Sequence, residues 1–143
     1  MRSKRGFTLI ELMLVIVIIG ALAAMVVPRL VGRSEEARIG AARADIKGNL
    51  SLALRLYEVD NGRYPATEQG LAALWQAPTA APRPANWRGP YLRQSVPADP
   101  WGAPYIYRAP GEHTPTAFDL SSLGADGAAG GTGDAADITS WKL

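Results

Sequence analysis

A long apolar segment near the N-terminus constrains the fold of this chain more than any other feature. Residues 12–27 carry no charge, and the apolar character extends back to Phe7 with Glu11 as its single interruption. A helix over residues 7–28 would be about 33 Å long, which is close to the hydrocarbon thickness of a bilayer. The segment is therefore predicted to cross a membrane as a helix.

The residues that precede this segment are basic and set its expected orientation. They are Arg2, Lys4 and Arg5. Basic residues before a spanning segment predict a cytoplasmic N-terminus and an exported remainder of the chain. A secretory signal peptide is the alternative, because residues 21–23 resemble a small-residue cleavage site. The apolar run is longer than the roughly 7–15 residues of such peptides, which argues against it.

Glu11 is the unusual residue of the segment. A carboxylate at the centre of a bilayer costs about 2.5–3.5 kcal/mol, and less near the interface, where Glu11 is expected. No Lys, Arg or His lies between Gly6 and Pro28, so a counter-cation has to come from elsewhere. Cleavage after Gly6 would create one, the free amine of Phe7, about one helical turn from Glu11. That amine could pair with Glu11 of the same chain or of a neighbouring copy.

The stretch RGFTLIE, residues 5–11, joins the basic leader to the apolar run. It resembles the processing signal of the type IV pilin-like family, with Gly6 before the cleavage site, Phe7 after it and Glu11 one turn further on. The resemblance implies cleavage between Gly6 and Phe7 by a prepilin peptidase, and N-methylation of the new Phe7 amine. It also implies a homopolymer in which Glu11 neutralises the Phe7 amine of an adjacent subunit.

This pair of charges is expected to set the register of a filament more than its stability. Attraction between the two groups is strong in a low-dielectric environment, but desolvation of both offsets much of it. Packing of the apolar helices should supply most of the cohesion.

Pro28 lies inside the helical pattern. Proline removes one backbone hydrogen bond and clashes with the preceding turn, so a kink or local melting is predicted there. In the pilin-like family, a proline near this place is associated with a stretch that unwinds on assembly. The alternative is that Pro28 marks the exit of the chain from the membrane.

Beyond the membrane segment, apolar residues recur at steps of three or four, which predicts one face of a helix. They are Ile39, Ala42, Ile46, Leu50, Leu54 and Tyr57. Asn61 and Gly62 end the pattern, and Gly62 suits a left-handed C-terminal cap. We therefore expect a nearly continuous helix over residues 7–61, whose apolar face packs against a head.

The composition changes at Gly62, after which proline and tryptophan become frequent. A short helix is predicted over residues 67–75. Alternating, β-rich stretches predict three strands, at residues 105–107, 117–123 and 138–141. The expected fold class is α+β and pilin-like, with a long N-terminal helix packed on a small antiparallel sheet of about three strands.

The predicted organisation has three parts. Residues 1–6 form a cleaved cytoplasmic leader, residues 7–30 the transmembrane and assembly helix, and residues 31–143 the exported head. Within the head, the second half of the helix, a variable loop region, and the sheet with an acidic loop follow in order, at residues 31–61, 62–104 and 105–143.

The chain lacks the side-chain groupings of an enzyme. It has no cysteine, and its single histidine, His113, lies in a turn-rich stretch and is interpreted as an exposed loop residue. No G-x-S-x-G, H-E-x-x-H or Walker-type motif occurs in the sequence. The net charge of +2 is too small to indicate nucleic acid as a partner. A non-enzymatic role is therefore predicted.

Several segments of the head are similar to those of one branch of the family, the major pseudopilins of type II secretion systems. They are YEVDNGRYP (57–65), EQGL (68–71), GPYL (89–92), PADPWG (97–102) and SLGADG (122–127). The resemblance implies a structural subunit that polymerises into a periplasmic pseudopilus and drives export of folded proteins across the outer membrane. The alternative is a type IV pilin of a surface fibre for adhesion or motility. The missing C-terminal cysteine pair and the acidic loop argue against that alternative.

Location and partners follow from the same resemblance. It implies a single-pass protein in the inner membrane of a Gram-negative bacterium, with a periplasmic head, extracted from the bilayer on assembly. Besides further copies of itself and the prepilin peptidase, the implied partners are the minor pseudopilins, the inner-membrane assembly platform, the exported proteins and the outer-membrane secretin.

An acidic, glycine-rich loop covers residues 124–137. Calcium takes roughly six to eight oxygen ligands from carboxylates and backbone carbonyls, and glycines let a backbone turn its carbonyls inward. The spacing does not match an EF-hand, so a flexible acidic turn between two strands is the alternative.

The pseudopilin resemblance implies that this loop binds calcium. Asp126 and Asp137 would be side-chain ligands and the carbonyls of Leu123 and Ala128 backbone ligands, with Asp134 as a further candidate. The ion would join the last two strands and act as the staple that a small head without disulfides needs.

Overall fold

The computed structural model describes residues 7–142, without the side chains of residues 27–31. Its contacts divide the chain into two units, which meet between Glu36 and Ala37. The predicted cleavage site, between Gly6 and Phe7, thus lies at the edge of the described residues, with Gly6 itself outside them. The division predicted at residue 30 rests on the position of a membrane and stays a prediction.

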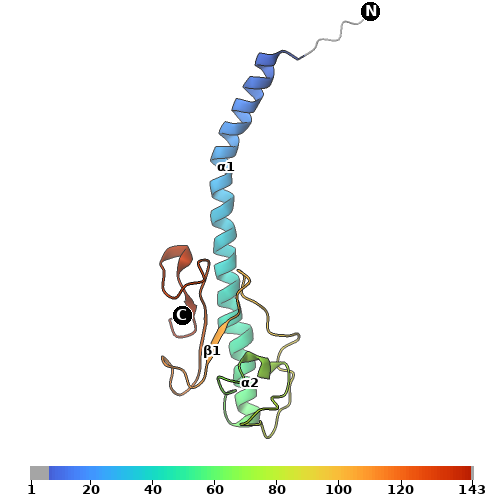
Figure 1. Ribbon diagram of the computed structural model, residues 1–143, viewed down its shortest axis with the longest axis vertical. Helices are drawn as coiled ribbons and strands as arrows, with labels where there is room; N and C mark the ends of the chain where they lie inside the picture. The colour runs from blue at the N-terminus through green and yellow to red at the C-terminus, as the bar shows by residue number, and fades with distance from the viewer. Residues whose placement is uncertain (1–6, 143) are drawn as a thin grey trace, which may run out of the picture. The chain divides into compact units, whose positions relative to one another are not determined.

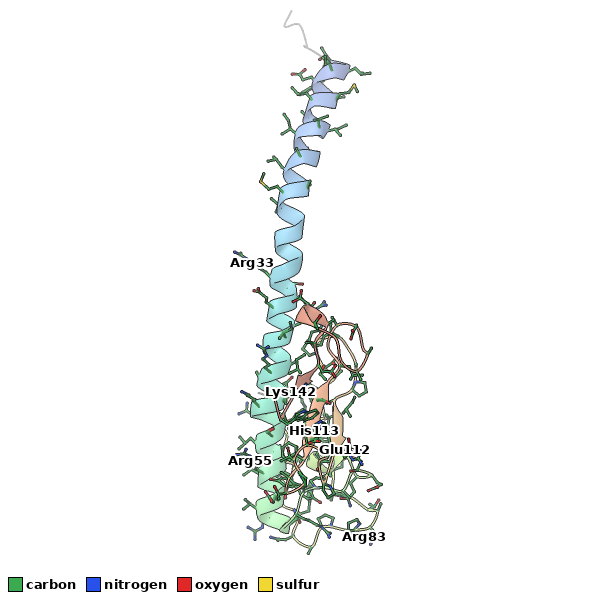
Figure 2. The ribbon with its side chains drawn as sticks, turned by 90° about the vertical axis from the view of Figure 1, so that its left-hand side faces the viewer. Arg33, Arg55, Arg83, Glu112, His113 and Lys142 are labelled. Atoms are coloured by element: carbon green, nitrogen blue, oxygen red, sulfur yellow. The ribbon has the colours of Figure 1, made fainter. Side chains whose placement is uncertain are left out.

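The first unit is the N-terminal part of helix α1, which spans Leu9–Ala44 (Figure 1). Within it, Leu9–Val26 has a mean hydropathy of 2.8 and none of its residues is buried. By length and composition this stretch is able to cross a membrane. Its side chains project outward along the helix, as Figure 2 shows, so no other part of this unit covers them.

Helix α1 continues through Pro28. The local melting predicted there is therefore not observed in the free chain. Proline removes only one backbone hydrogen bond, and the turns on either side keep theirs. Unwinding on assembly is a separate matter and stays a prediction.

The second unit continues the helix through a π-helical turn, η1 (Asp45–Leu50), into α2 (Ser51–Asn61). Gly62 ends α2 with φ 71°, and its N–H donates to the Glu58 carbonyl at 2.7 Å. The predicted long helix and its left-handed glycine cap are confirmed. The π turn was not predicted.

The apolar stripe predicted for the helix is the centre of the core. Ala42, Ile46, Leu50, Leu54 and Tyr57 are fully buried, and Ile39 packs against them. Side chains spaced four residues apart move gradually around an α-helix, because one turn holds about 3.6 residues. The wider π turn takes up this drift, so the stripe stays on the face that meets the head.

Three short strands form an antiparallel sheet in the order β1-β2-β3, as predicted. They are β1 (Ile106–Arg108), β2 (Asp119–Ser122) and β3 (Ile138–Thr139). Tyr107 faces Leu120 across the first pair, and Ser122 faces Ile138 across the second. Leu120 and Ile138 are buried in the core with the helix stripe. The α+β fold with a helix against a three-stranded sheet is thereby confirmed.

The helix predicted over residues 67–75 is mostly absent. Only a 3-10 turn, η2 (Leu71–Leu74), forms there. Gly70 has φ 60° and ψ −165°, a conformation outside the helical region, and it interrupts the segment. Leu71 and Leu74 still face inward and are buried, as the apolar pattern indicated.

Candidate functional site

Glu11 takes part in a capping box at the start of α1. The Glu11 N–H donates to Thr8 Oγ1 at 3.3 Å, and the Thr8 N–H donates to Glu11 Oε2 at 3.4 Å. This reciprocal Thr-x-x-Glu arrangement satisfies two backbone donors that a helix N-terminus otherwise leaves unpaired. The chain therefore supplies Glu11 with a hydrogen-bond donor that was not predicted, whereas the source of a counter-cation stays a prediction. The Thr8–Glu11 spacing was the signal in the sequence.

Phe7 lies just before this cap and is 77% exposed. The Glu11 side chain reaches back toward it, because its carboxylate accepts from the adjacent residue, Thr8. Pairing of Glu11 with a processed Phe7 amine requires cleavage and, for an adjacent subunit, a second chain. It stays a prediction.

The acidic loop leaves the sheet and returns to it between β2 and β3. Ser122, the last residue of β2, faces Ile138, the first of β3. The two backbones stay close beyond the sheet, since a Cβ on Gly124 would lie 3.0 Å from the Ala136 carbonyl oxygen. This register brings Leu123 and Asp137 together, two of the five predicted calcium ligands.

Asp137 has one satisfied and one unsatisfied carboxylate oxygen. Its Oδ2 accepts the Gly130 N–H at 2.9 Å, and its own N–H donates to the Gly130 carbonyl at 3.2 Å. Its Oδ1 is buried, and no described residue gives it a hydrogen bond. A buried carboxylate oxygen of this kind is costly unless a donor or a cation meets it.

The other predicted ligands are exposed. Asp126 Oδ1 accepts the Ala128 N–H at 3.0 Å, and Asp134 lies in a 3-10 turn, η3 (Gly133–Ala135). Between residues 7 and 142, no group of three or more His, Cys, Asp or Glu side chains is arranged to hold a metal ion. The structure therefore brings Leu123 and Asp137 together but does not gather Asp126 and Asp134 around them.

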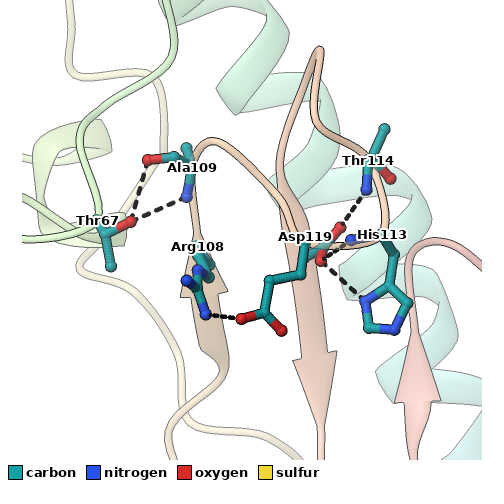
Figure 3. A network of polar contacts seen from close by, with 7 residues as sticks. Thr67, Arg108, Ala109, His113, Thr114 and Asp119 are labelled. Atoms are coloured by element: carbon teal, nitrogen blue, oxygen red, sulfur yellow. Dashed lines mark hydrogen bonds and ion pairs between the residues drawn. The ribbon is translucent and has the colours of Figure 1, made fainter.

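A polar network that the sequence did not reveal surrounds Asp119, at the start of β2 (Figure 3). Its carboxylate accepts the N–H groups of His113 at 2.8 Å and Thr114 at 3.1 Å, and His113 Nδ1 lies 3.0 Å away. Burial raises the pKa of Asp119, but these hydrogen bonds and the imidazole outweigh burial, so the pKa is lowered overall. Gly111 allows this approach, because a Cβ there would lie 2.4 Å from Asp119 Oδ1.

His113 lies exposed in the loop between β1 and β2, as predicted, but the sequence did not reveal its contacts. Its side chain is 52% exposed, but its ring is held by Asp119 and by a stacking contact with Trp141. All of these contacts are made within the head and fix the turn between β1 and β2. They form a network whose contacts are structural.

Comparison with known proteins agrees with this geometry. The family model described as "Type II secretion system (T2SS), protein G" matches residues 29–141, and the "Prokaryotic N-terminal methylation motif" matches residues 1–27. The type II secretion system core protein G of Pseudomonas aeruginosa is 50% identical over 140 residues, which cover 98% of this chain and 96% of that protein. The protein of the same name from Escherichia coli K12 is 50% identical over 141 residues, or 99% and 93% of the two chains.

A solved structure supports the same relationship. It is the crystal structure of the major pseudopilin from the type 2 secretion system of enterohaemorrhagic Escherichia coli, with a TM-score of 0.65 and 41% sequence identity, covering 82% of this chain and 98% of that one. The processing motif, the long helix with its three-stranded sheet and these sequence matches agree along nearly the whole chain. The chain therefore belongs to the type II secretion system protein G family, the major pseudopilins, which are structural subunits and not enzymes.

Proposed function

We propose that this chain polymerises from the inner membrane into a periplasmic pseudopilus that drives export of folded proteins. The observation that carries the proposal is the apolar stretch Leu9–Val26, none of which is buried by the chain itself. An apolar surface of this extent needs a cover. Lipid covers it before assembly, and the same helices of neighbouring copies cover it in the filament.

Processing of the N-terminus prepares the subunit for assembly. Cleavage between Gly6 and Phe7 by a prepilin peptidase releases the leader, and methylation follows on the Phe7 amine. Glu11 then pairs with the Phe7 amine of an adjacent subunit. The capping box supports this pairing, because it turns the Glu11 carboxylate toward the end of the helix where that amine is created.

The remaining partners and boundaries belong to the same proposal. Residues 1–6 are the leader, residues 7–30 the transmembrane helix and residues 31–143 the periplasmic head. Helix α1 unwinds near Pro28 as the subunit leaves the bilayer. The filament contacts the minor pseudopilins, the inner-membrane assembly platform, the exported proteins and the outer-membrane secretin.

The loop between β2 and β3 binds calcium in this proposal. The residues fit such an ion: among the described residues no group donates to the buried Asp137 Oδ1, and the β2–β3 register, which pairs Ser122 with Ile138, continues to Leu123 and Asp137 just beyond the sheet. Asp126 and the Ala128 carbonyl would complete the ligand set, with Asp134 as a further candidate. The ion supplies a positive charge that holds the two ends of the loop together.

Two measurements test the assembly proposal. Mass spectrometry of the mature chain should find methylated Phe7 at its N-terminus; an intact Met1, or a start after Ala23, would contradict it. Loss of the chain should leave folded exoproteins in the periplasm, and a copy supplied in trans should restore export. A surface-fibre pilin would instead affect adhesion or motility and leave export unchanged.

A further inference from the structure

We propose that Asp99 and Ser122 are positioning residues for the calcium loop, and that they act by fixing the direction of the Leu123 carbonyl. This inference rests on the calcium site proposed above. It assigns a role to two buried residues that are not themselves ligands.

Asp99 is held firmly within the turn that precedes β1. It is 4% exposed, and its Oδ1 accepts the N–H groups of Trp101 at 3.1 Å and Ala103 at 2.8 Å. The Asp99 N–H also donates to the Ala103 carbonyl at 2.8 Å. These bonds leave Oδ2 pointing at Ser122, whose Oγ is 2.6 Å away. A carboxylate only accepts hydrogen bonds, so the Ser122 hydroxyl donates its proton to Asp99.

The orientation of this hydroxyl determines what Ser122 offers to the loop. Ser122 is fully buried at the end of β2. Since its proton is directed to Asp99, its lone pairs face the loop, where Oγ accepts the Gly124 N–H at 3.2 Å. The Asp99 carboxylate thereby fixes the position of the Gly124 N–H through Ser122.

The Leu123–Gly124 peptide transmits this constraint to the proposed ligand. In a planar trans peptide, the N–H and the C=O point in opposite directions. Because the Gly124 N–H points at Ser122 Oγ, the Leu123 carbonyl points away from it. Gly124 makes this turn at φ 69°, and its lack of a side chain lets the Ala136 backbone approach.

The experiment uses the full chain in detergent micelles, labelled with carbonyl-¹³C leucine and ¹⁵N glycine. Leu123–Gly124 is the only Leu-Gly pair in the sequence, so a carbonyl-to-nitrogen correlation spectrum contains a single cross-peak. Titration with calcium chloride should shift this peak until it saturates. In Ser122→Ala, the peak should start from a different position and the apparent Kd should rise about tenfold, the lower end of the range for residues that orient metal ligands.

Two further variants separate positioning from general destabilisation. Asp99→Asn keeps an oxygen for the turn but presents an amide donor to Ser122, so it should also weaken calcium binding. Ser140→Ala is the matched control: the Ser140 Oγ accepts the Leu120 N–H at 3.0 Å on the same strand pair, away from the loop. It should lower the melting temperature and leave the calcium Kd unchanged.

The outcomes distinguish this inference from the calcium site on which it rests. If Asp99→Asn and Ser122→Ala bind calcium like the unmodified chain, the positioning role is wrong and the site stands. If Ser140→Ala weakens binding by the same factor, the effect is one of stability and the role is again wrong. If the unmodified chain gives no saturable shift and matches Asp137→Ala, the site is wrong and the positioning role falls with it.

Discussion

The imidazole of His113 lies flat on the indole of Trp141, with ring centroids 4.1 Å apart and planes inclined by 5°. The same imidazole has Nδ1 3.0 Å from Asp119 Oδ2. The contact joins the turn between β1 and β2 to the segment after β3. Asp119 therefore holds the turn between β1 and β2 directly, and holds the segment after β3 through the His113 imidazole.

Replacing Asp119 by asparagine should lower the free energy of unfolding of the head. It should also make that free energy depend less on pH in the acid range. The pKa of Asp119 lies below the ordinary value of 3.8, so the carboxylate stabilises the fold above that pH, and this contribution is lost as the pH falls through the folded-state pKa. Asp119→Asn should cost about 1–3 kcal/mol at neutral pH, since hydrogen bonds to a charged group are lost. Urea unfolding between pH 2 and pH 7 measures both effects.

The exposed pair of Arg108 and Glu112 provides the control for Asp119. Both side chains are more than half exposed, and solvent screens such a pair strongly. Glu112→Gln should therefore leave the unfolding curves nearly unchanged. Equal losses from Asp119→Asn and Glu112→Gln would contradict the anchoring role of Asp119.

Two buried tyrosines should respond oppositely to loss of the hydroxyl. Tyr107 OH donates to the Pro65 carbonyl at 2.8 Å, so Tyr107→Phe leaves a buried acceptor unpaired and should cost about 1–2 kcal/mol. The Tyr57 hydroxyl is buried and meets no hydrogen-bond partner in the described part of the chain, so Tyr57→Phe should be neutral or stabilising. Thermal unfolding of the two variants tests this. A larger loss for Tyr57→Phe would show that its hydroxyl has a partner in solution.

The same Gly→Ala change should have opposite signs at two positions of the helix. Gly62 has φ 71°, a conformation that alanine adopts at a cost of about 1 kcal/mol. Gly40 lies inside α1 with open space where a Cβ would sit, so Gly40→Ala should stabilise by roughly 0.5–1 kcal/mol. Thermal melts of the two variants in detergent measure the difference. Stabilisation by Gly62→Ala would contradict the left-handed cap.

Chelation should lower the melting temperature of the chain. Calcium at about a hundred times its Kd stabilises a folded protein by about 2.7 kcal/mol, which corresponds to several degrees for a domain of this size. Scanning calorimetry with calcium and with EDTA measures the shift. Asp137→Ala should melt at the same temperature in both solutions. An EDTA effect that persists in Asp137→Ala would place the ion elsewhere.

Substitutions at the capping box should separate the two roles of Glu11. Glu11→Leu removes the cap and the charge, whereas Glu11→Gln keeps a capping side chain without the charge. If pairing with a neighbour's amine sets the filament register, both variants should insert in the membrane but assemble poorly. Electron microscopy of overproduced filaments measures assembly. Thr8→Ala weakens only the cap and should assemble into filaments. Normal filaments from Glu11→Gln would show that Glu11 acts only as a helix cap.

Periodicity in the sequence was sufficient to find the parts of the fold that depend on local chain geometry. The stripe from Ala42 to Tyr57 and the cap at Gly62 follow from helix geometry alone. The π turn could not be predicted, because it depends on how the stripe meets the head. The stacking of His113 on Trp141 joins residues distant in sequence, and single-sequence patterns carry no such pairing.

The candidate sites were predictable to different degrees. Phe7 and Glu11 stand in a short motif, so one stretch of sequence was enough to identify them. The Thr-x-x-Glu spacing of the same stretch also indicates the capping role of Thr8, which was not predicted. In the acidic loop, composition indicated only the chemistry of a calcium ligand set, and the pseudopilin resemblance singled out Asp126 and Asp137. Only the strand register revealed that Asp137 meets Leu123 while Asp126 stays exposed.

The π turn at Asp45–Leu50 also bears on how this helix can change in length. A wide turn stores one surplus residue between two regular stretches. Deleting a single residue from it should therefore yield an ordinary α-helix, with Ala42 and Leu54 still facing the same core. Insertions and deletions elsewhere in a helix rotate everything downstream by about 100° per residue. The length of the stem can therefore change by one residue at the π turn while the buried face of the helix stays against the core.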